Sequence, residues 1–277
     1  MKFPTPGAAV LGAVGLVALS SCKEEPPPVH SPGPASQSPA QDKPVARADP
    51  SVAPTPAPLT GGGTVSGVVL FKGNAPTPSA IPPSEDPACQ GMPLVDQSLR
   101  VKDGKVENVL VRVRGLMPHT GSEQPAVIDQ HQCTYVPRIQ GVAVGQPILI
   151  KNSDGTLHNA RALSGTKSLF NVAQPPNGKV VQRPLPADAE VVRLKCDIHP
   201  WMTSWVVVNP NPYFVTSNAE GAFSIEHLPA GTYTLEAWHE TLGTKTVEVT
   251  LKEGETTTAS FSFSTGDVRS TASNSEK

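Results

Sequence analysis

Residues 216–263 read TSNAEGAFSIEHLPAGTYTLEAWHETLGTKTVEVTLKEGETTTASFSF, and this stretch decides the fold class. Short alternations of apolar and polar residues follow one another here, each bounded by turn residues, at Phe223–Ile225, Thr232–Trp238, Thr244–Leu251 and Thr256–Phe263. Strands that recur about every 8–12 residues are typical of a β-sandwich. The sequence therefore predicts an all-β fold, with Greek-key β-sandwiches and little helix.

The same pattern continues upstream of this stretch. We expect a strand at Thr64–Phe71, and a hairpin in which Asp103-Gly104 joins Leu99–Val101 to Val106–Val113. Further strands are expected at Pro147–Lys151, Val191–Lys195 and Ser204–Val208. Long helices are excluded, because no window without Pro or Gly keeps a helical period for several turns.

Proline is unevenly distributed along the chain. The 277 residues include 31 prolines and 23 glycines, a composition close to that of disordered proteins. Eleven of the prolines fall within residues 23–63, which contain no aromatic residue. Such a segment cannot bury enough apolar surface to offset its ordering entropy, so we predict a semi-rigid tether of about 3.1 Å per residue where extended. The polar tail, residues 265–277, is also expected to be disordered.

Residues 1–22 are typical of a secretory signal. Lys2 precedes an apolar run of 12 residues, Ala8–Leu19, which is shorter than the roughly 20 residues needed to span a membrane. The run ends in Leu19-Ser20-Ser21-Cys22, which resembles the lipobox of bacterial lipoproteins. The resemblance implies cleavage before Cys22 and lipidation of that residue, with an outer-membrane protein facing the periplasm or cell surface. An ordinary signal peptide with an incidental cysteine is the alternative.

The other cysteines are Cys89, Cys133 and Cys196. An exported domain lies in an oxidising compartment, where exposed free thiols rarely persist. Cys196 lies among other metal-binding side chains, so we expect Cys89 and Cys133 to form a disulfide that stabilises the fold by roughly 2–4 kcal/mol. Two separate buried thiols are the alternative.

The strongest chemical signal is Cys196-Asp197-Ile198-His199-Pro200-Trp201-Met202, which places Cys, His and Met in seven residues. A mononuclear blue-copper centre needs two imidazoles, a thiolate and a weak axial thioether. His158, at the end of an Asn/Asp-rich turn, supplies the second imidazole. We therefore predict one copper ion held by His158, Cys196, His199 and Met202. Zinc is a poorer match because its protein sites rarely use Met. The alternative is that these residues only fill the core or surface of a sandwich.

This loop resembles the ligand loop of the cupredoxins, most closely that of amicyanin, and the strand and turn before His158 are similar to those that deliver the family's first histidine. The resemblance implies a cupredoxin-like domain at 122–209, with an exposed His199 edge in an apolar patch where redox proteins dock. Asn159 matches the residue that ties the two ligand loops by hydrogen bonds, and an ordinary turn Asn is the alternative. Pro200 and Trp201 flank His199. Trp201 is either a docking residue or a core residue beneath Met202.

A second resemblance involves residues 216–225 and 228–235, which are similar to the carboxypeptidase regulatory-like, or transthyretin-like, β-sandwich. In that fold the earlier strands precede this segment closely, whereas here a long stretch intervenes. We therefore expect one sandwich formed by 64–121 and 210–264, with the cupredoxin-like domain inserted in it. Two domains in simple succession are the alternative.

Together these features predict an electron carrier and not an enzyme. The protein would be monomeric, anchored by its lipid, and would exchange one electron with redox protein partners in the periplasm through the His199 edge. A formal net charge of −2 gives no electrostatic sign of nucleic-acid binding, so we expect no nucleic-acid partner. One alternative is copper handling, meaning sequestration or delivery. Another is a carbohydrate-binding or adhesion module, because regulatory-like sandwiches resemble starch-binding domains.

Overall fold

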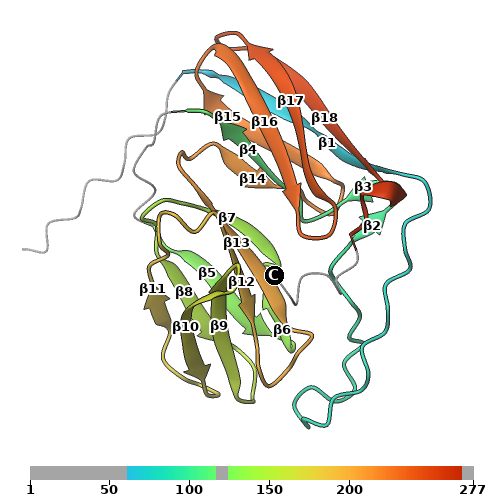
Figure 1. Ribbon diagram of the computed structural model, residues 1–277, viewed down its shortest axis with the longest axis vertical. Helices are drawn as coiled ribbons and strands as arrows, with labels where there is room; N and C mark the ends of the chain where they lie inside the picture. Colours follow the sequence, from blue (N-terminus) through green and yellow to red (C-terminus); the bar gives the residue numbers. More distant parts are fainter. Residues whose placement is uncertain (1–60, 117–123, 270–277) are drawn as a thin grey trace, which may run out of the picture. The chain divides into compact units, whose positions relative to one another are not determined.

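The computed structural model of the protein describes residues 61–116 and 124–269 (Figure 1). Within these residues the chain forms strands, and the one helical element there is a 3-10 turn at Thr265–Asp267. The all-β prediction is confirmed. No helix in these two ranges is long and apolar enough to cross a membrane. The expected signal sequence, Cys22 and nearly all of the tether at 23–63 lie outside the described residues.

The first sandwich is built from the two ends of the described chain. One sheet has the order β15-β1-β3-β2, with β18 also paired to β1, and the other has the order β14-β4-β16-β17. Its strands are β1 (Gly63–Lys72), β2 (Val101–Lys102), β3 (Lys105–Val106), β4 (Leu110–Arg114), β14 (Phe214–Thr216), β15 (Ala222–Leu228), β16 (Gly231–His239), β17 (Gly243–Leu251) and β18 (Thr256–Ser264). β1 and β18 run parallel, blue-cyan beside orange-red in Figure 1. Val65, Val111, Leu235 and Phe261 are at most 3% exposed in the core between the sheets.

The second sandwich is formed by residues 126–209. Its sheets have the orders β10-β9-β12-β13-β7 and β11-β8-β5-β6. Its strands are β5 (Ala126–His131), β6 (Thr134–Val136), β7 (Ile139–Ala143), β8 (Ile148–Asn152), β9 (His158–Ser164), β10 (Lys167–Gln174), β11 (Val181–Arg183), β12 (Val191–Lys195) and β13 (Thr203–Asn209). Ile128, Ile150, Leu194 and Val206 are fully buried in its core.

The order of the two sandwiches along the chain follows from the strand pairing. β1 pairs with β15 and β18, and β4 pairs with β14 and β16. Strands before residue 126 thus pair with strands after residue 209, and the second sandwich lies between the two parts of the first in the sequence. The expected boundary at residues 121 and 122 falls outside the described residues.

The predicted strand Val106–Val113 is two strands in the structure. β3 ends at Val106 and β4 begins at Leu110, and between them Asn108 has φ of 65°, a conformation that Asn tolerates better than most residues. The Ser217 hydroxyl donates to the Val106 carbonyl and accepts from the Val109 N–H, both at 2.9 Å. The chain therefore leaves one sheet at Asn108 and enters the other.

The polar tail begins later than expected. Thr265–Asp267, which we expected to belong to a disordered tail, forms the 3-10 turn. The Asp267 carboxylate accepts hydrogen bonds from the backbone N–H and the hydroxyl of Ser264, and it pairs with Lys245 at 3.0 Å. These contacts fix the conformation of residues 265–267, although their composition does not indicate an ordered segment.

Candidate metal centre

The loop after β12 is folded by its own backbone. Cys196 directly follows the strand and is 1% exposed. The Met202 N–H donates to the His199 carbonyl at 2.9 Å, and the Cys196 N–H donates to the Met202 carbonyl at 3.2 Å. The His199 N–H points to the Cys196 sulfur at 3.4 Å. These hydrogen bonds bring Cys196, His199 and Met202 close together without the help of a metal ion.

His158 brings the fourth predicted ligand from a neighbouring strand. It is the first residue of β9, which pairs with β12, and it is fully buried. Its Nδ1 lies 2.9 Å from Nδ1 of His199, and the latter lies 3.8 Å from Sγ of Cys196. Ligand atoms of these three residues all lie within 4.8 Å of one another. Met202 is 1% exposed and belongs to the same core cluster as Cys196.

The separations fit a single metal ion. In zinc sites, nitrogen and sulfur ligands lie about 2.0–2.1 Å and about 2.3 Å from the ion. Two nitrogens 2.9 Å apart and a sulfur 3.8 Å from one of them can therefore surround one ion of similar size. The donor set of two imidazoles, a thiol and a nearby thioether is of the kind that copper prefers.

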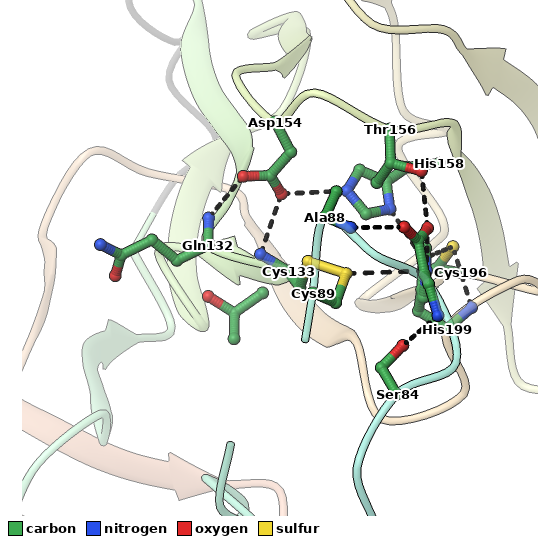
Figure 2. Close-up of a disulfide and its surroundings, with 12 residues drawn as sticks. Ser84, Ala88, Cys89, Gln132, Cys133, Asp154, Thr156, His158, Cys196 and His199 are labelled. Atoms are coloured by element: carbon green, nitrogen blue, oxygen red, sulfur yellow. Dashed lines mark hydrogen bonds and ion pairs between the residues drawn. A yellow bond between two sulfur atoms is a disulfide. The ribbon is translucent and has the colours of Figure 1, made fainter. Parts of the chain in front are cut away.

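Each histidine is held on its other side by a carboxylate. Nε2 of His158 lies 2.9 Å from Asp154 (Figure 2). Nε2 of His199 lies 3.0 Å from Asp86. Because a carboxylate only accepts, each Nε2 donates to its carboxylate, and in a neutral ring the Nδ1 atom is then the nitrogen available to bind a metal. Burial lowers the pKa of His158, which favours the neutral imidazole that a metal requires.

Both carboxylates have further donors. Asp154 accepts from the backbone N–H groups of Gln132 and Cys133, at 2.7 and 2.9 Å (Figure 2). Asp86 accepts from the Thr156 hydroxyl at 2.6 Å. This hydroxyl contributes most to lowering the pKa of Asp86. The two carboxylates are therefore fixed in place, and each fixes a histidine ring.

A disulfide fastens a long loop next to His199. Cys89 and Cys133 are bonded to each other, and Sγ of Cys89 lies 3.8 Å from Nε2 of His199 (Figure 2). Residues 79–98, which we call the covering segment, carry Cys89 and Asp86 and are also joined by an isolated bridge between Ala80 and Val95. The covering segment is thus held beside the metal centre by the disulfide to Cys133 and by the hydrogen bonds of Asp86 to His199 and Thr156.

The expectation of an exposed His199 edge is wrong. His199 is only 2% exposed, because Asp86 and Cys89 lie against its Nε2. Pro200 is exposed, and Ile198 is 47% exposed. Trp201 is half-buried: its ring centroid lies 5.2 Å from that of His199, and its Nε1 donates to the Cys133 carbonyl at 2.9 Å.

Asn159 connects the two ligand-bearing segments. Its Oδ1 accepts from the backbone N–H of Asp197 at 2.7 Å and lies 3.4 Å from the Cys196 sulfur. Its Nδ2 donates to Asn171 and to the Asp197 carboxylate. The residue next to His158 is therefore bonded directly to the loop that follows β12.

Sequence reasoning missed Asp86 and Asp154 as members of the site. Asp154 had a visible signal, because it lies four positions before His158 in the turn that precedes β9. Asp86 had only the weaker signal of its nearness to Cys89. Of the predicted site residues, the structure brings together His158, Asn159, Cys196, His199, Pro200, Trp201 and Met202, with the bonded Cys89 and Cys133 beside them. Cys22 lies outside the described residues.

Comparisons with known proteins follow the same division of the chain. The family model of the carboxypeptidase regulatory-like domain matches residues 206–264. No match was found among curated proteins. Among solved structures, the chain is similar to a purple cupredoxin from Nitrosopumilus maritimus, with 23% identity, a TM-score of 0.27, and 30% of this chain and 99% of that one covered.

Two further structures are similar to the same degree. A methionine-to-alanine mutant of amicyanin in its Cu(I) form shows 17% identity and a TM-score of 0.27, covering 36% of this chain and 98% of that one. A copper-containing nitrite reductase from Thermus scotoductus shows 17% identity and a TM-score of 0.28, covering 43% and 28%. Part of the first sandwich matches the carboxypeptidase regulatory-like domain, and the chain is similar to cupredoxins over part of its length.

Proposed function

We propose that this protein is a type 1 copper protein that carries one electron at a time. His158, His199 and Cys196 would be the three strong ligands and Met202 the weak axial one. The observation that carries the proposal is the convergence of two Nδ1 atoms and one sulfur in a buried position, with both Nε2 atoms bonded to carboxylates. When bound, copper would supply the Cu(I)/Cu(II) couple.

The surrounding residues suit a centre that changes little between oxidation states. Asp86 and Asp154 hold the imidazole rings, and the His199 N–H donates to the Cys196 sulfur. Such outer contacts fix ligand orientation before the metal arrives. Four protein ligands leave no open position for a substrate, which is why we propose a carrier and not an enzyme.

We further propose that the carrier is exported and attached to the outer membrane through a lipid on Cys22. The tether at 23–63 would then separate the lipid from the folded domains. A disulfide between Cys89 and Cys133 supports the export step, because structural disulfides persist in oxidising compartments. This protein would be a monomer, and its partners would be redox proteins of the periplasm.

The test is a titration of Cu(II) into the full-length chain purified without metal in detergent. We expect an intense thiolate-to-copper absorption band that saturates at one copper per chain. The band should be lost in Cys196→Ala and retained in His131→Gln, which changes an exposed histidine outside the site. A colourless complex with tight Cu(I) binding would favour copper handling. No copper uptake would rule out both electron transfer and copper handling, and would favour an adhesion module.

A further inference from the structure

A cleft of about 890 Å³ lies beside the proposed metal centre. Small-molecule sites typically have volumes of about 300–1,000 Å³, so the cleft has the size of such a site. Its lining comes from the covering segment, from Arg138 between β6 and β7, from the loop at 198–201, and from side chains on β12, β13 and the residues after β16. His199 is one of the lining residues.

Arg193 is the cleft's unpaired cation. It lies on β12 directly across from Trp205 on β13, and its guanidinium carbon is 5.6 Å from the centroid of the Trp205 ring. Its Nε is buried and has no hydrogen-bond partner, and no carboxylate in the described part of the chain pairs with it. Buried N–H groups of this kind are rarely left unsatisfied, and a guanidinium presents a fixed fork suited to a carboxylate or sulfonate.

The other charged groups of the cleft are already engaged or lie in solvent. Arg138 makes two hydrogen bonds to the Glu240 carboxylate, at 2.5 and 3.0 Å. Asp86 holds His199, and Asp96 accepts from the Ser98 N–H at 2.8 Å. Glu85 is exposed. Of the two arginines in this lining, Arg193 is therefore the one without a carboxylate partner.

The rest of the lining offers flat and apolar surfaces. Trp201 is half-buried against His199, and Ile198 and Pro200 are exposed next to it, with Ile81 on the covering segment. Aromatic and aliphatic side chains around one unpaired cation are typical of sites that bind a planar ring with an anionic substituent.

We propose that this cleft binds a small planar aromatic molecule that carries a carboxylate or sulfonate. The anionic group would pair with Arg193, and the ring would lie against Trp201 and Ile198, beside His199. Every group in this proposal belongs to the metal-free chain, so binding does not depend on the proposed function. If the proposed function also holds, the bound ring lies beside a copper ligand.

Isothermal titration calorimetry of the full-length, metal-free chain with 2-naphthoate tests the proposal. We expect saturable binding with one site per chain. Cyclohexanecarboxylate, which lacks the aromatic ring, and 2-naphthylmethylammonium, which reverses the charge, should each bind about tenfold more weakly or worse. Arg193→Gln should weaken the binding of naphthoate by about tenfold or more, because the paired charge is lost.

Two further variants keep the result interpretable. Ile198→Glu places a negative charge on an exposed residue of the rim, where it should not disturb folding but should weaken naphthoate binding. Arg183→Gln removes an arginine that does not line the cleft and should leave binding unchanged. Equal affinity of the unchanged chain and Arg193→Gln, equal binding of the cationic probe, or no saturable binding of naphthoate would overturn the proposal. Loss of copper uptake with naphthoate binding retained would instead count only against the proposed function.

Discussion

Asp86 lies 3.0 Å from Nε2 of His199, although 113 positions separate the two residues in the sequence. The contact joins a loop that follows the first strand of one sandwich to the ligand loop of the other. It makes the covering segment part of the proposed metal centre, because it determines which nitrogen of His199 is free to bind.

Asp86→Ala should weaken copper binding by about 10- to 100-fold, the usual effect of losing an outer partner of a ligand histidine. Competition against a chelator of known affinity measures this change. Glu85→Gln is the matched control, because it removes a neighbouring exposed carboxylate that has no contact with His199, and its affinity should equal that of the unchanged chain. An unchanged affinity in Asp86→Ala would show that the contact does not support the ligand.

Replacing both Cys89 and Cys133 with Ser should destabilise the fold by about 2–4 kcal/mol, because the unfolded chain regains its freedom. Urea unfolding measures this loss. The same variant should release copper to a chelator faster, because the covering segment is then held near His199 without its covalent bond. Equal release rates in the variant and the unchanged chain would mean that the disulfide does not control access to the metal.

Arg138→Met should destabilise the protein by about 3–5 kcal/mol. Arg138 and Glu240 form a buried pair with side chains 11% and 8% exposed, and loss of the arginine leaves a buried carboxylate without its partner. Burial already raises the pKa of Glu240. The control is Lys151→Met, whose pair with Asp129 is far more exposed and should contribute less than about 1 kcal/mol. Similar losses of stability in the two variants would contradict the view that Arg138 and Glu240 form a stabilising buried pair.

His239 should make the fold less stable as the pH falls. Burial lowers its pKa from 6.5 to about 3, so the native state keeps it neutral while the unfolded state takes up a proton below pH 6.5. Its contribution to stability is therefore full above pH 6.5 and declines towards pH 3, by up to about 1.4 kcal/mol per pH unit.

The variant His239→Asn isolates this effect, because its side-chain oxygen can still accept from the N–H groups of Thr241 and Leu242 as Nδ1 does. Urea unfolding at several pH values between 3 and 7 should show a shallower decline for the variant than for the unchanged chain. Parallel curves would mean that His239 is not the group responsible.

The parts that could be predicted from sequence depend on short-range patterns. Cys196, His199 and Met202 lie in one loop, so their spacing was visible, and the alternation in Ala222–Ser264 indicated its strands. β9 and β10 were not predicted, because β9 begins with three buried residues in a row and β10 has a single buried residue, so neither alternates cleanly. The place of Asp86 could not be predicted, because it depends on how a distant loop folds onto the site.

The disulfide also has a consequence for the order of assembly. The sulfur of Cys89 lies near His199 and Asp86, and that of Cys133 lies near Asp154 and His158, so each could join a metal-binding group. Before oxidation, the same small volume would offer three thiols and two imidazoles, a set well suited to zinc or to Cu(I) in several arrangements. Oxidation removes two of those thiols and leaves Cys196 as the one free sulfur donor among the described cysteines. If Cys89 and Cys133 are oxidised before a metal arrives, Cys196 is the one thiolate left beside the two histidines, and the disulfide would then favour the predicted copper ligand set over sites with several thiolates.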